Sequence, residues 1–211
     1  MNEVHAHREH VPPALGRDPL VLHVQPAIDL TSEQFFALCQ LNRDLRLERT
    51  AKGDIIVLPP TGAATGARNL RLGVQVSLWA ERDGSGVVFG SSTGFELPNG
   101  ATRSPDVAWV RRTRLAQLTP QQKERFLPLC PDFVIELLSP SDSLPLAKEK
   151  MHEYVANGTQ LGWLIDPEHR RVFVYRSGAA TECLDDSLHL TGEPLLKGFT
   201  LDLLPIWDPG F

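Results

Sequence analysis

The chain has 211 residues, of which 42% are hydrophobic and 22% are charged, and its formal net charge is −5. This composition is typical of a globular protein with a single core of ordinary size. It excludes a general nucleic-acid coat, which needs a basic surface, and no apolar run approaches the roughly 20 residues that span a bilayer. We therefore expect a soluble protein without a membrane partner.

The three cysteines, Cys39, Cys130 and Cys183, are widely separated and contain no Cys-x-x-Cys pair. Disulfides and structural zinc are not expected from this pattern, and a reducing cytoplasm fits it best. The first residues mix charges and lack the apolar segment of a secretory signal. We expect residues 1–25 to form a flexible tail and residues 26–211 to form one domain, since no repeat or long linker interrupts them.

Hydrophobic periodicity and turn signals predict an alternation of strands and helices. The expected elements, in chain order, are a helix over 31–41, strands over 45–48 and 54–58, a helix over 67–82, strands over 86–89, 95–97 and 104–110, a short helix over 120–126, a strand over 133–138, a helix from the start signal at 139–143 to 157, strands over 161–166 and 172–175, and weaker strands over 181–184 and 199–203. The strands within 86–110 are expected to form a meander. The strand, helix and strand within 133–165 predict a parallel crossover, so the sheet should be mixed.

Two short apolar runs each carry one acid. Asp106 opens the run that ends at Val110, and Glu136 lies inside a run that is apolar on both sides, which is the pattern of a buried strand. A buried, unpaired carboxylate costs several kcal/mol, so such acids are usually paired, neutralised or bound to a metal. Acids on neighbouring strands could share Mg²⁺, which takes oxygen ligands. The alternative is a turn at Asp106 and an arginine or lysine partner for Glu136.

Other charged residues are open to more than one interpretation. Lys148 and Lys150 lie on opposite flanks of the apolar face of the helix after Glu136, and spacing alone does not choose between them. Glu48 stands at the turn end of its strand, where a solvated acid is the default. A basic strip near the Asp106 strand could serve a nuclease, or could be a solvated loop. Its members are Arg103, Arg111, Arg112 and Arg114. The Gly-rich segment before the second helix lacks the Gly-Lys-Ser/Thr ending of a phosphate loop.

Several sequence blocks together resemble the motifs of the Uma-two family, which are bacterial proteins of the PD-(D/E)XK nuclease superfamily. The blocks are Ser91-Ser92-Thr93-Gly94-Phe95, Arg103-Ser104-Pro105-Asp106, Pro131-Asp132-Phe133-Val134-Ile135-Glu136-Leu137, Ser141-Asp142-Ser143-Leu144, Glu149-Lys150-Met151 and Gly162-Trp163-Leu164-Ile165-Asp166-Pro167. The resemblance extends over roughly 30–207. It implies an α/β (α+β) fold of the restriction-endonuclease type, with a central mixed sheet flanked by helices.

The resemblance also implies a site. Asp106, Glu136 and the backbone carbonyl of Leu137 would bind Mg²⁺, or Mn²⁺ as a substitute, and Lys150 would be the catalytic lysine. Glu48 matches a family acid and would be an outer ligand or orient water. The implied activity is endonucleolytic hydrolysis of phosphodiester bonds, with DNA as the expected partner. A homodimer is a further expectation, since cutting two strands needs two sites.

Two departures from the family pattern favour an alternative. The slot two residues after Glu136, where the superfamily places its lysine, is Leu138, and Ala64 stands where many relatives have an acid. A catalytically impaired module that binds nucleic acid or a protein is therefore a second hypothesis. A structural or oligomerisation protein is a third, and it predicts no stabilisation by a metal.

Overall fold

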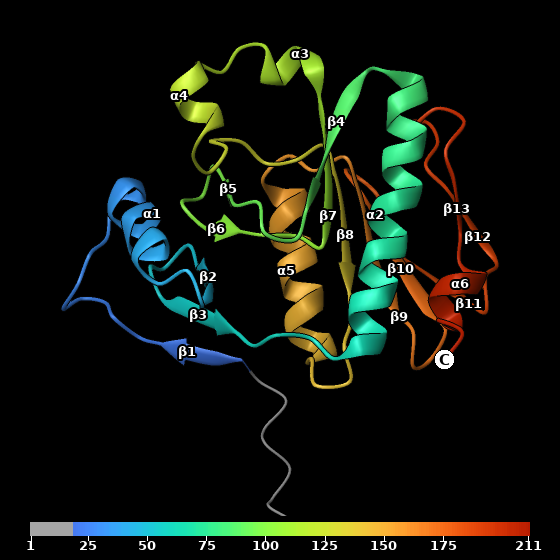
Figure 1. Ribbon diagram of the computed structural model, residues 1–211, viewed down its shortest axis with the longest axis horizontal. Helices are drawn as coiled ribbons and strands as arrows, with labels where there is room; N and C mark the ends of the chain where they lie inside the picture. The colour runs from blue at the N-terminus through green and yellow to red at the C-terminus, as the bar shows by residue number, and fades with distance from the viewer. Residues whose placement is uncertain (1–18) are drawn as a thin grey trace, which may run out of the picture.

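The computed structural model of the protein describes residues 19–211. In this part of the chain thirteen strands form three sheets, and six helices surround them (Figure 1). The strands are β1 (Leu20–Leu22), β2 (Arg46–Arg49), β3 (Ile55–Leu58), β4 (Gly86–Gly90), β5 (Phe95–Glu96), β6 (Thr102–Arg103), β7 (Val107–Arg111), β8 (Phe133–Leu137), β9 (Leu161–Asp166), β10 (Arg171–Arg176), β11 (Glu182–Asp185), β12 (His189–Thr191) and β13 (Thr200–Asp202). The helices are α1 (Ser32–Leu41), α2 (Ala63–Asp83), α3 (Arg112–Leu115), α4 (Pro120–Lys123), α5 (Leu144–Ala156) and α6 (Leu204–Trp207).

The centre of the molecule is a six-stranded sheet in the order β11-β10-β9-β8-β7-β4. Strands β8 and β9 run parallel, with Phe133 opposite Leu161, whereas β7 and β8 run antiparallel. Helix α5 connects the two parallel strands, because a parallel pair needs a long crossover. The predicted crossover unit and the predicted mixed sheet are confirmed.

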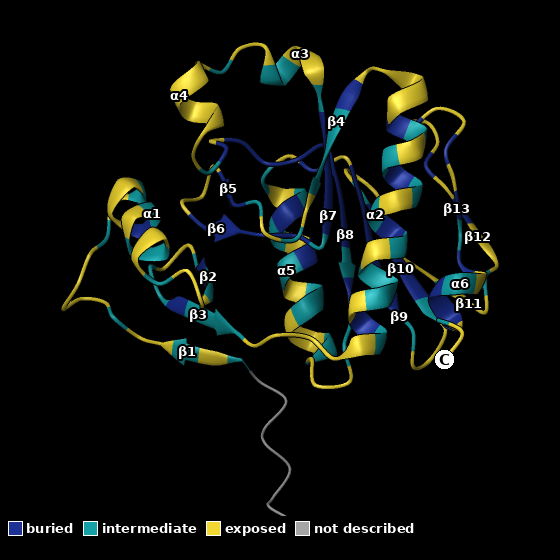
Figure 2. Cartoon of the chain, in the orientation of Figure 1, coloured by how far each residue is buried: buried dark blue, intermediate teal, exposed yellow. Residues whose placement is uncertain are grey.

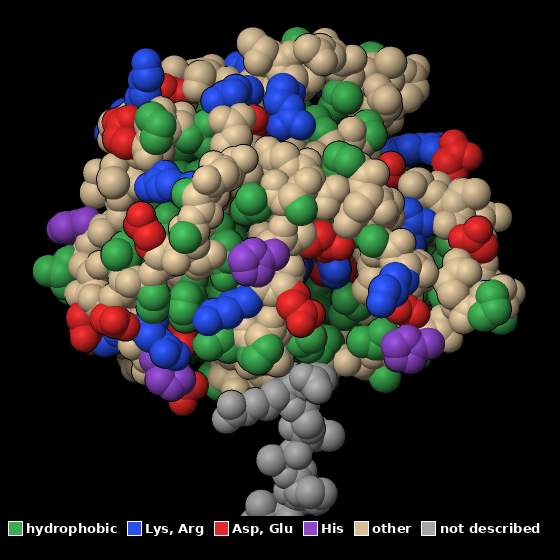
Figure 3. Space-filling model, turned by 180° about the vertical axis from the view of Figure 1, so that it is seen from behind, with side chains coloured by type: hydrophobic (Ala, Val, Ile, Leu, Met, Phe, Trp, Pro, Cys, Tyr) green, Lys and Arg blue, Asp and Glu red, His purple; other side chains and the backbone are tan. Residues whose placement is uncertain are grey.

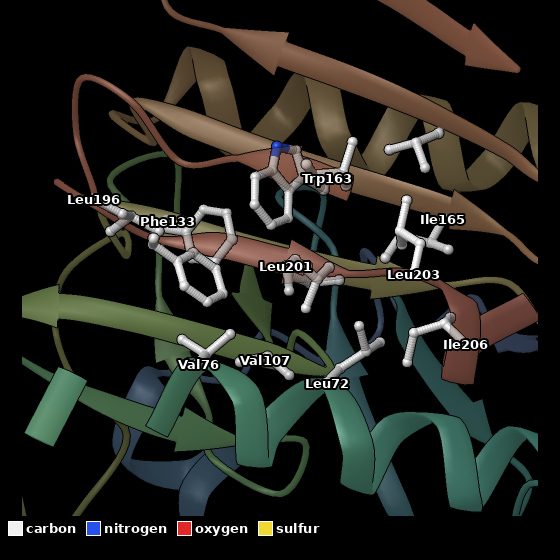
Figure 4. Packing of buried hydrophobic residues seen from close by; sticks show 14 of the residues in the cluster. Leu72, Val76, Val107, Phe133, Trp163, Ile165, Leu196, Leu201, Leu203 and Ile206 are labelled. Atoms are coloured by element: carbon white, nitrogen blue, oxygen red, sulfur yellow. The ribbon is translucent and has the colours of Figure 1, made fainter. Parts of the chain in front are cut away.

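Strands β7, β8 and β9 are almost entirely buried and mostly apolar because both faces of this sheet are covered. Helix α2 covers one face, where Leu72 and Val76 share a core cluster with Phe133 and Trp163 (Figure 4). Helix α5 covers the other face. Figure 2 shows these strands as the most continuously buried part of the fold. Since side chains alternate across a strand, Glu136 faces α5.

A second sheet, in the order β1-β3-β2-β6-β5, carries the N-terminal hairpin. Strands β2 and β3 pair antiparallel as predicted. Within the tail expected over 1–25, Leu20–Leu22 form β1 and pair with β3, and residues 1–18 lie outside the described part. Strand β5 pairs with β6 in this second sheet, not with β4, so the predicted meander is wrong. Strands of two residues carry too little pattern to indicate their sheet.

Helix boundaries differ from the predicted ones for local reasons. Helix α2 begins at Ala63, earlier than predicted, and ends where Gly84 adopts the left-handed conformation (φ 72°) and donates its N–H to the carbonyl of Ala80. The start signal over 139–143 begins with a turn, in which the backbone N–H of Ser139 donates to the Asp142 carboxylate over 2.7 Å, and its last residue, Ser143, is the N-cap of α5. Although α2 has 21 residues, neither it nor another helix within 19–211 is long and apolar enough to cross a membrane.

Candidate active site

The ammonium group of Lys150 lies between two carboxylates. Its Nζ atom is 2.9 Å from Oε1 of Glu48 and 2.9 Å from Oε1 of Glu136. Glu136 also accepts a hydrogen bond from the Tyr154 hydroxyl over 2.9 Å. Lys150 and Tyr154 are one helical turn apart on α5, so both reach the same strand. Lys148 lies elsewhere, with its Nζ atom 4.0 Å from the centre of the Phe173 ring.

Asp106 lies at the start of β7, beside the end of β8. The register pairs Val107 with Ile135, and its continuation by one residue brings Asp106 opposite Glu136. One carboxylate oxygen of Asp106 accepts the backbone N–H of Leu137 over 2.9 Å, and the other accepts the Asn69 side-chain amide from α2 over 3.0 Å. Two strands and a helix therefore hold this carboxylate.

Glu48 is 1% exposed, so the default interpretation of a solvated acid at the end of a hairpin is wrong. Its carboxylate accepts the backbone N–H of Ser104 over 2.9 Å and a guanidinium N–H of Arg103 over 3.2 Å, in addition to its contact with Lys150. Arg103 in turn contacts Glu153 over 2.6 Å. These partners satisfy the carboxylate oxygens and make its burial tolerable.

The protonation states follow from burial and from neighbouring charges. Burial raises the pKa of Glu136, and the charges of Asp106 and Glu48 add to this effect, so the pKa reaches about 7 in spite of Lys150. Burial also raises the pKa of Asp106, although the hydrogen bond from Leu137 partly opposes it. Burial works to raise the pKa of Glu48 as well, but Lys150 and Arg103 outweigh it and lower that pKa.

The carboxylates outnumber the cations around Lys150. The charged groups at the site are four carboxylates (Glu48, Asp106, Glu136 and Glu153) and three cations (Arg46, Arg103 and Lys150). Within residues 19–211 no three acidic, histidine or cysteine side chains converge as a metal cluster. Mg²⁺ is commonly held by one or two carboxylates together with water, so the paired Asp106 and Glu136, both with raised pKa values, fit a divalent cation.

The structure brings Glu48, Asp106, Glu136 and Lys150 together, and Leu137 adjoins them through its backbone. The basic strip, which was one of two interpretations of these arginines, does not form as a set. Arg103 is buried in ion pairs, Arg111 and Arg114 contact Asp132, and Arg112 donates to the carbonyl of Gly84. On the face seen in Figure 3, basic side chains are interspersed with acidic and apolar ones.

Sequence reasoning missed several residues of the site. Arg46 lies two positions before Glu48, so strand alternation would have put the two on one face. The spacing of Tyr154 fits the apolar face of its helix, so nothing in the sequence indicates that its hydroxyl contacts Glu136. Asn69 carries no local signal, because its contact with Asp106 depends on how α2 packs on the sheet.

The mixed sheet therefore brings Asp106 and Glu136 together at the ends of neighbouring strands, and Lys150 reaches Glu136 from the covering helix α5. The model of the Uma2 family, described as "Putative restriction endonuclease", matches residues 32–204. The chain therefore belongs to the Uma2 family, and the family prediction is confirmed.

A solved structure with a similar fold is that of "a putative nuclease belonging to DUF820" from Anabaena variabilis. It superposes with a TM-score of 0.70 at 22% sequence identity, and the match covers 85% of this chain and 98% of that chain. At this identity the likeness shows the fold alone, and it confirms the predicted fold class. No curated protein matches the sequence.

Proposed function

We propose that the protein is a metal-dependent endonuclease that hydrolyses phosphodiester bonds in DNA. The observation that carries this proposal is the bridge from Lys150 to Glu48 and Glu136 beside a second buried acid, Asp106. Family membership and the fold of the similar structure support the nuclease class. The proposed metal and residue roles rest on the site's chemistry, and the proposed preference for DNA rests on the description of the family as a restriction endonuclease.

In the proposed site Asp106, Glu136 and the Leu137 carbonyl would hold Mg²⁺, or Mn²⁺ in its place. A divalent cation, when bound, supplies polarisation of a phosphoryl oxygen and a lowered pKa for water. Burial raises the pKa of both acids, and a bound cation would favour their ionised forms by supplying the positive charge that burial leaves uncompensated.

Lys150 would act as a cation, not as a base. Burial works to lower its pKa, but Glu136 and Glu48 outweigh burial and raise it. A protonated ammonium donates hydrogen bonds and stabilises negative charge that develops on a phosphoryl group. Glu48 would be a positioning residue, because it contacts Lys150 and is buried away from the surface.

The test combines metal binding with cleavage. Thermal melting of the wild type and of Asp106→Ala and Glu136→Ala variants is measured with and without millimolar Mg²⁺ or Mn²⁺, beside cleavage of plasmid DNA, single-stranded DNA and RNA. We expect stabilisation by the metal and cleavage of DNA in the wild type, and loss of both in the variants. Cleavage of RNA alone would correct the substrate class, and full activity in either variant would remove that residue from the mechanism.

A catalytically impaired binding module is the second candidate. It is favoured by Ala64, which is half-buried in the first turn of α2, the helix that also carries the Asp106 contact. Leu138 gives less support to the binding module than Ala64 does. Its side chain packs against the core, and Lys150 from helix α5 already contacts Glu136. Retention of DNA without cleavage in the presence of either metal would support the binding module.

Two further expectations belong to the proposal. A homodimer would place two sites on a duplex, and light scattering in solution measures the mass of the assembly. The cysteines Cys39, Cys130 and Cys183 are all free, which is consistent with the expected reducing cytoplasm.

A further inference from the structure

Arg46 is the cation of the site that is not held by a hydrogen bond to a carboxylate. One of its guanidinium nitrogens donates to the backbone carbonyl of Ser104 over 2.9 Å and lies 3.9 Å from an oxygen of Asp106. Lys150 and Arg103, by contrast, each contact two carboxylates within 3.2 Å. A separation of 3.9 Å gives charge attraction without a hydrogen bond.

The guanidinium of Arg46 also has unused hydrogen-bonding capacity. Its Nε atom is buried and has no hydrogen-bond partner within the described residues. An arginine has five N–H donors in a rigid fork, and leaving a buried one unpaired costs about 1–3 kcal/mol. A ligand that approaches from solvent would not reach the buried Nε–H, but its oxygen acceptors would pair with the terminal N–H groups, of which one donates to Ser104.

Arg46 is more accessible to a ligand than the acids beside it. Its side chain is 31% exposed, whereas that of Asp106 is 10% exposed and that of Glu48 is 2% exposed. Arg46 is therefore the most exposed of these three side chains. Strand β2 holds it there, since Arg46 and Glu48 project from the same face of that strand.

We propose that Arg46 binds a phosphate of the nucleic-acid substrate at the entrance of the site. The fork geometry of a guanidinium matches two oxygens of a phosphate and favours bidentate contact. This inference rests on the proposed nuclease function and adds a substrate-binding residue to it. The competing explanation is that Arg46 only balances the charge of Asp106.

The test is DNA binding measured separately from cleavage. A short fluorescein-labelled duplex is titrated with wild type, Arg46→Ala, Arg46→Lys and Arg112→Ala in Ca²⁺, at several salt concentrations, with fluorescence anisotropy as the readout. Arg112 is the matched control, because it is an arginine outside the site that donates to the Gly84 carbonyl. Each phosphate contact on duplex DNA contributes about 0.9 to the slope of log K against log salt.

We expect Arg46→Ala to bind about tenfold more weakly, in line with the loss of a charge-assisted hydrogen bond, and to show a salt slope reduced by about 0.9. Arg46→Lys should keep the wild-type slope and lose part of the affinity, since lysine keeps the charge and loses the fork. Arg112→Ala should match the wild type in both quantities.

Three results would overturn the inference. If the wild type binds DNA and Arg46→Ala shows the same salt slope as the wild type, Arg46 does not contact a phosphate. The nuclease proposal is unaffected by that result. If the salt slope is unchanged but the metal changes the melting temperature of Arg46→Ala by a different amount than that of the wild type, Arg46 only balances the charge of Asp106. Absence of wild-type binding to DNA overturns both the inference and the proposed substrate. If Arg46→Ala does not fold, the slope of Arg46→Gln decides in its place.

Discussion

The Nζ atom of Lys150 lies 2.9 Å from Oε1 of Glu136, although the lysine comes from helix α5 and the glutamate from strand β8. The family resemblance led us to look for a lysine two residues after Glu136, and the chain has Leu138 at that position. A lysine from the covering helix reaches the same carboxylate because Glu136 points toward that helix. The change of element leaves the ion pair intact.

Removal of the Lys150 ammonium group, which Glu48 and Glu136 share, should destabilise the protein. In Lys150→Ala the carboxylates of Glu48 and Glu136 lose their common partner, and breaking a buried pair costs about 3–5 kcal/mol. Lys148→Ala is the matched control, since Lys148 lies over the Phe173 ring and such contacts contribute about 0.5–1 kcal/mol at exposed sites. Urea unfolding gives both values. Equal stabilities for the two variants would contradict the role of Lys150 as the bridge.

The pH dependence of stability should report Glu136. Its pKa of about 7 lies above the ordinary value of 4.5 for a glutamate, so the folded state binds the proton more tightly than the unfolded state. Its contribution to stability is therefore present below about pH 4.5 and is lost as pH rises to about 7, by at most about 1.4 kcal/mol per pH unit.

Glu136→Gln removes this titration. Without divalent cations the stability of the variant relative to the wild type should increase between pH 5 and pH 8, as measured by urea unfolding at both values. The lowered pKa of Glu48 acts in the opposite direction and loses its stabilisation as pH falls, but both proteins share it. A difference between the two proteins that does not change with pH would contradict the assignment.

Asp132 follows a proline, as Asp106 does, but it should be structural. It is 1% exposed, accepts the backbone N–H of Arg111 over 3.0 Å and lies 3.1 Å from Arg114. Asp132→Ala should lower the free energy of unfolding by about 3 kcal/mol, because it leaves these donors without an acceptor. The shift in melting temperature caused by a metal should persist in this variant and disappear in Asp106→Ala. Its loss in Asp132→Ala would place Asp132 at the site.

Two glycines of strand β4 should differ sharply on replacement. A Cβ atom on Gly86 would lie 2.1 Å from the Trp109 ring, whereas a Cβ atom on Gly90 would have no heavy atom within 4 Å. Overpacking of this kind costs about 1–3 kcal/mol, so Gly86→Ala should be destabilised by that amount or more. Gly90→Ala, measured in the same urea series, should resemble the wild type. Similar stabilities for the two variants would show that Trp109 moves without cost.

The elements with strong local patterns could be predicted from the sequence. Strand β8 is apolar on both sides and is bounded by turns, so its burial and its crossover to β9 followed from pattern alone. Asp106 and Glu136 were identified for the same reason, since an acid in an apolar run is conspicuous. Lys150 needed the family resemblance, because two lysines fit the helix equally well.

The remaining features depend on contacts between distant segments. Glu48 looks solvated within its hairpin, and its burial arises from partners 55, 56 and 102 positions away in the chain. Strands β5 and β6 are too short for a period, and their sheet is decided by pairing with β2 and with each other. Contacts of this kind between distant segments cannot be predicted from the local sequence.

The loop between α2 and β4 divides the candidate site into two halves. Arg46, Glu48 and Asn69 precede it, and their partners Arg103, Ser104, Asp106 and Lys150 follow it. Each of these contacts therefore joins the segment before Gly84 to the segment after it. Two fragments separated at Gly84 would each lack a complete site, and mixing them would restore the contacts only as the halves reassemble. Under the proposed function, cleavage by the mixture would then measure how far the two fragments reassemble.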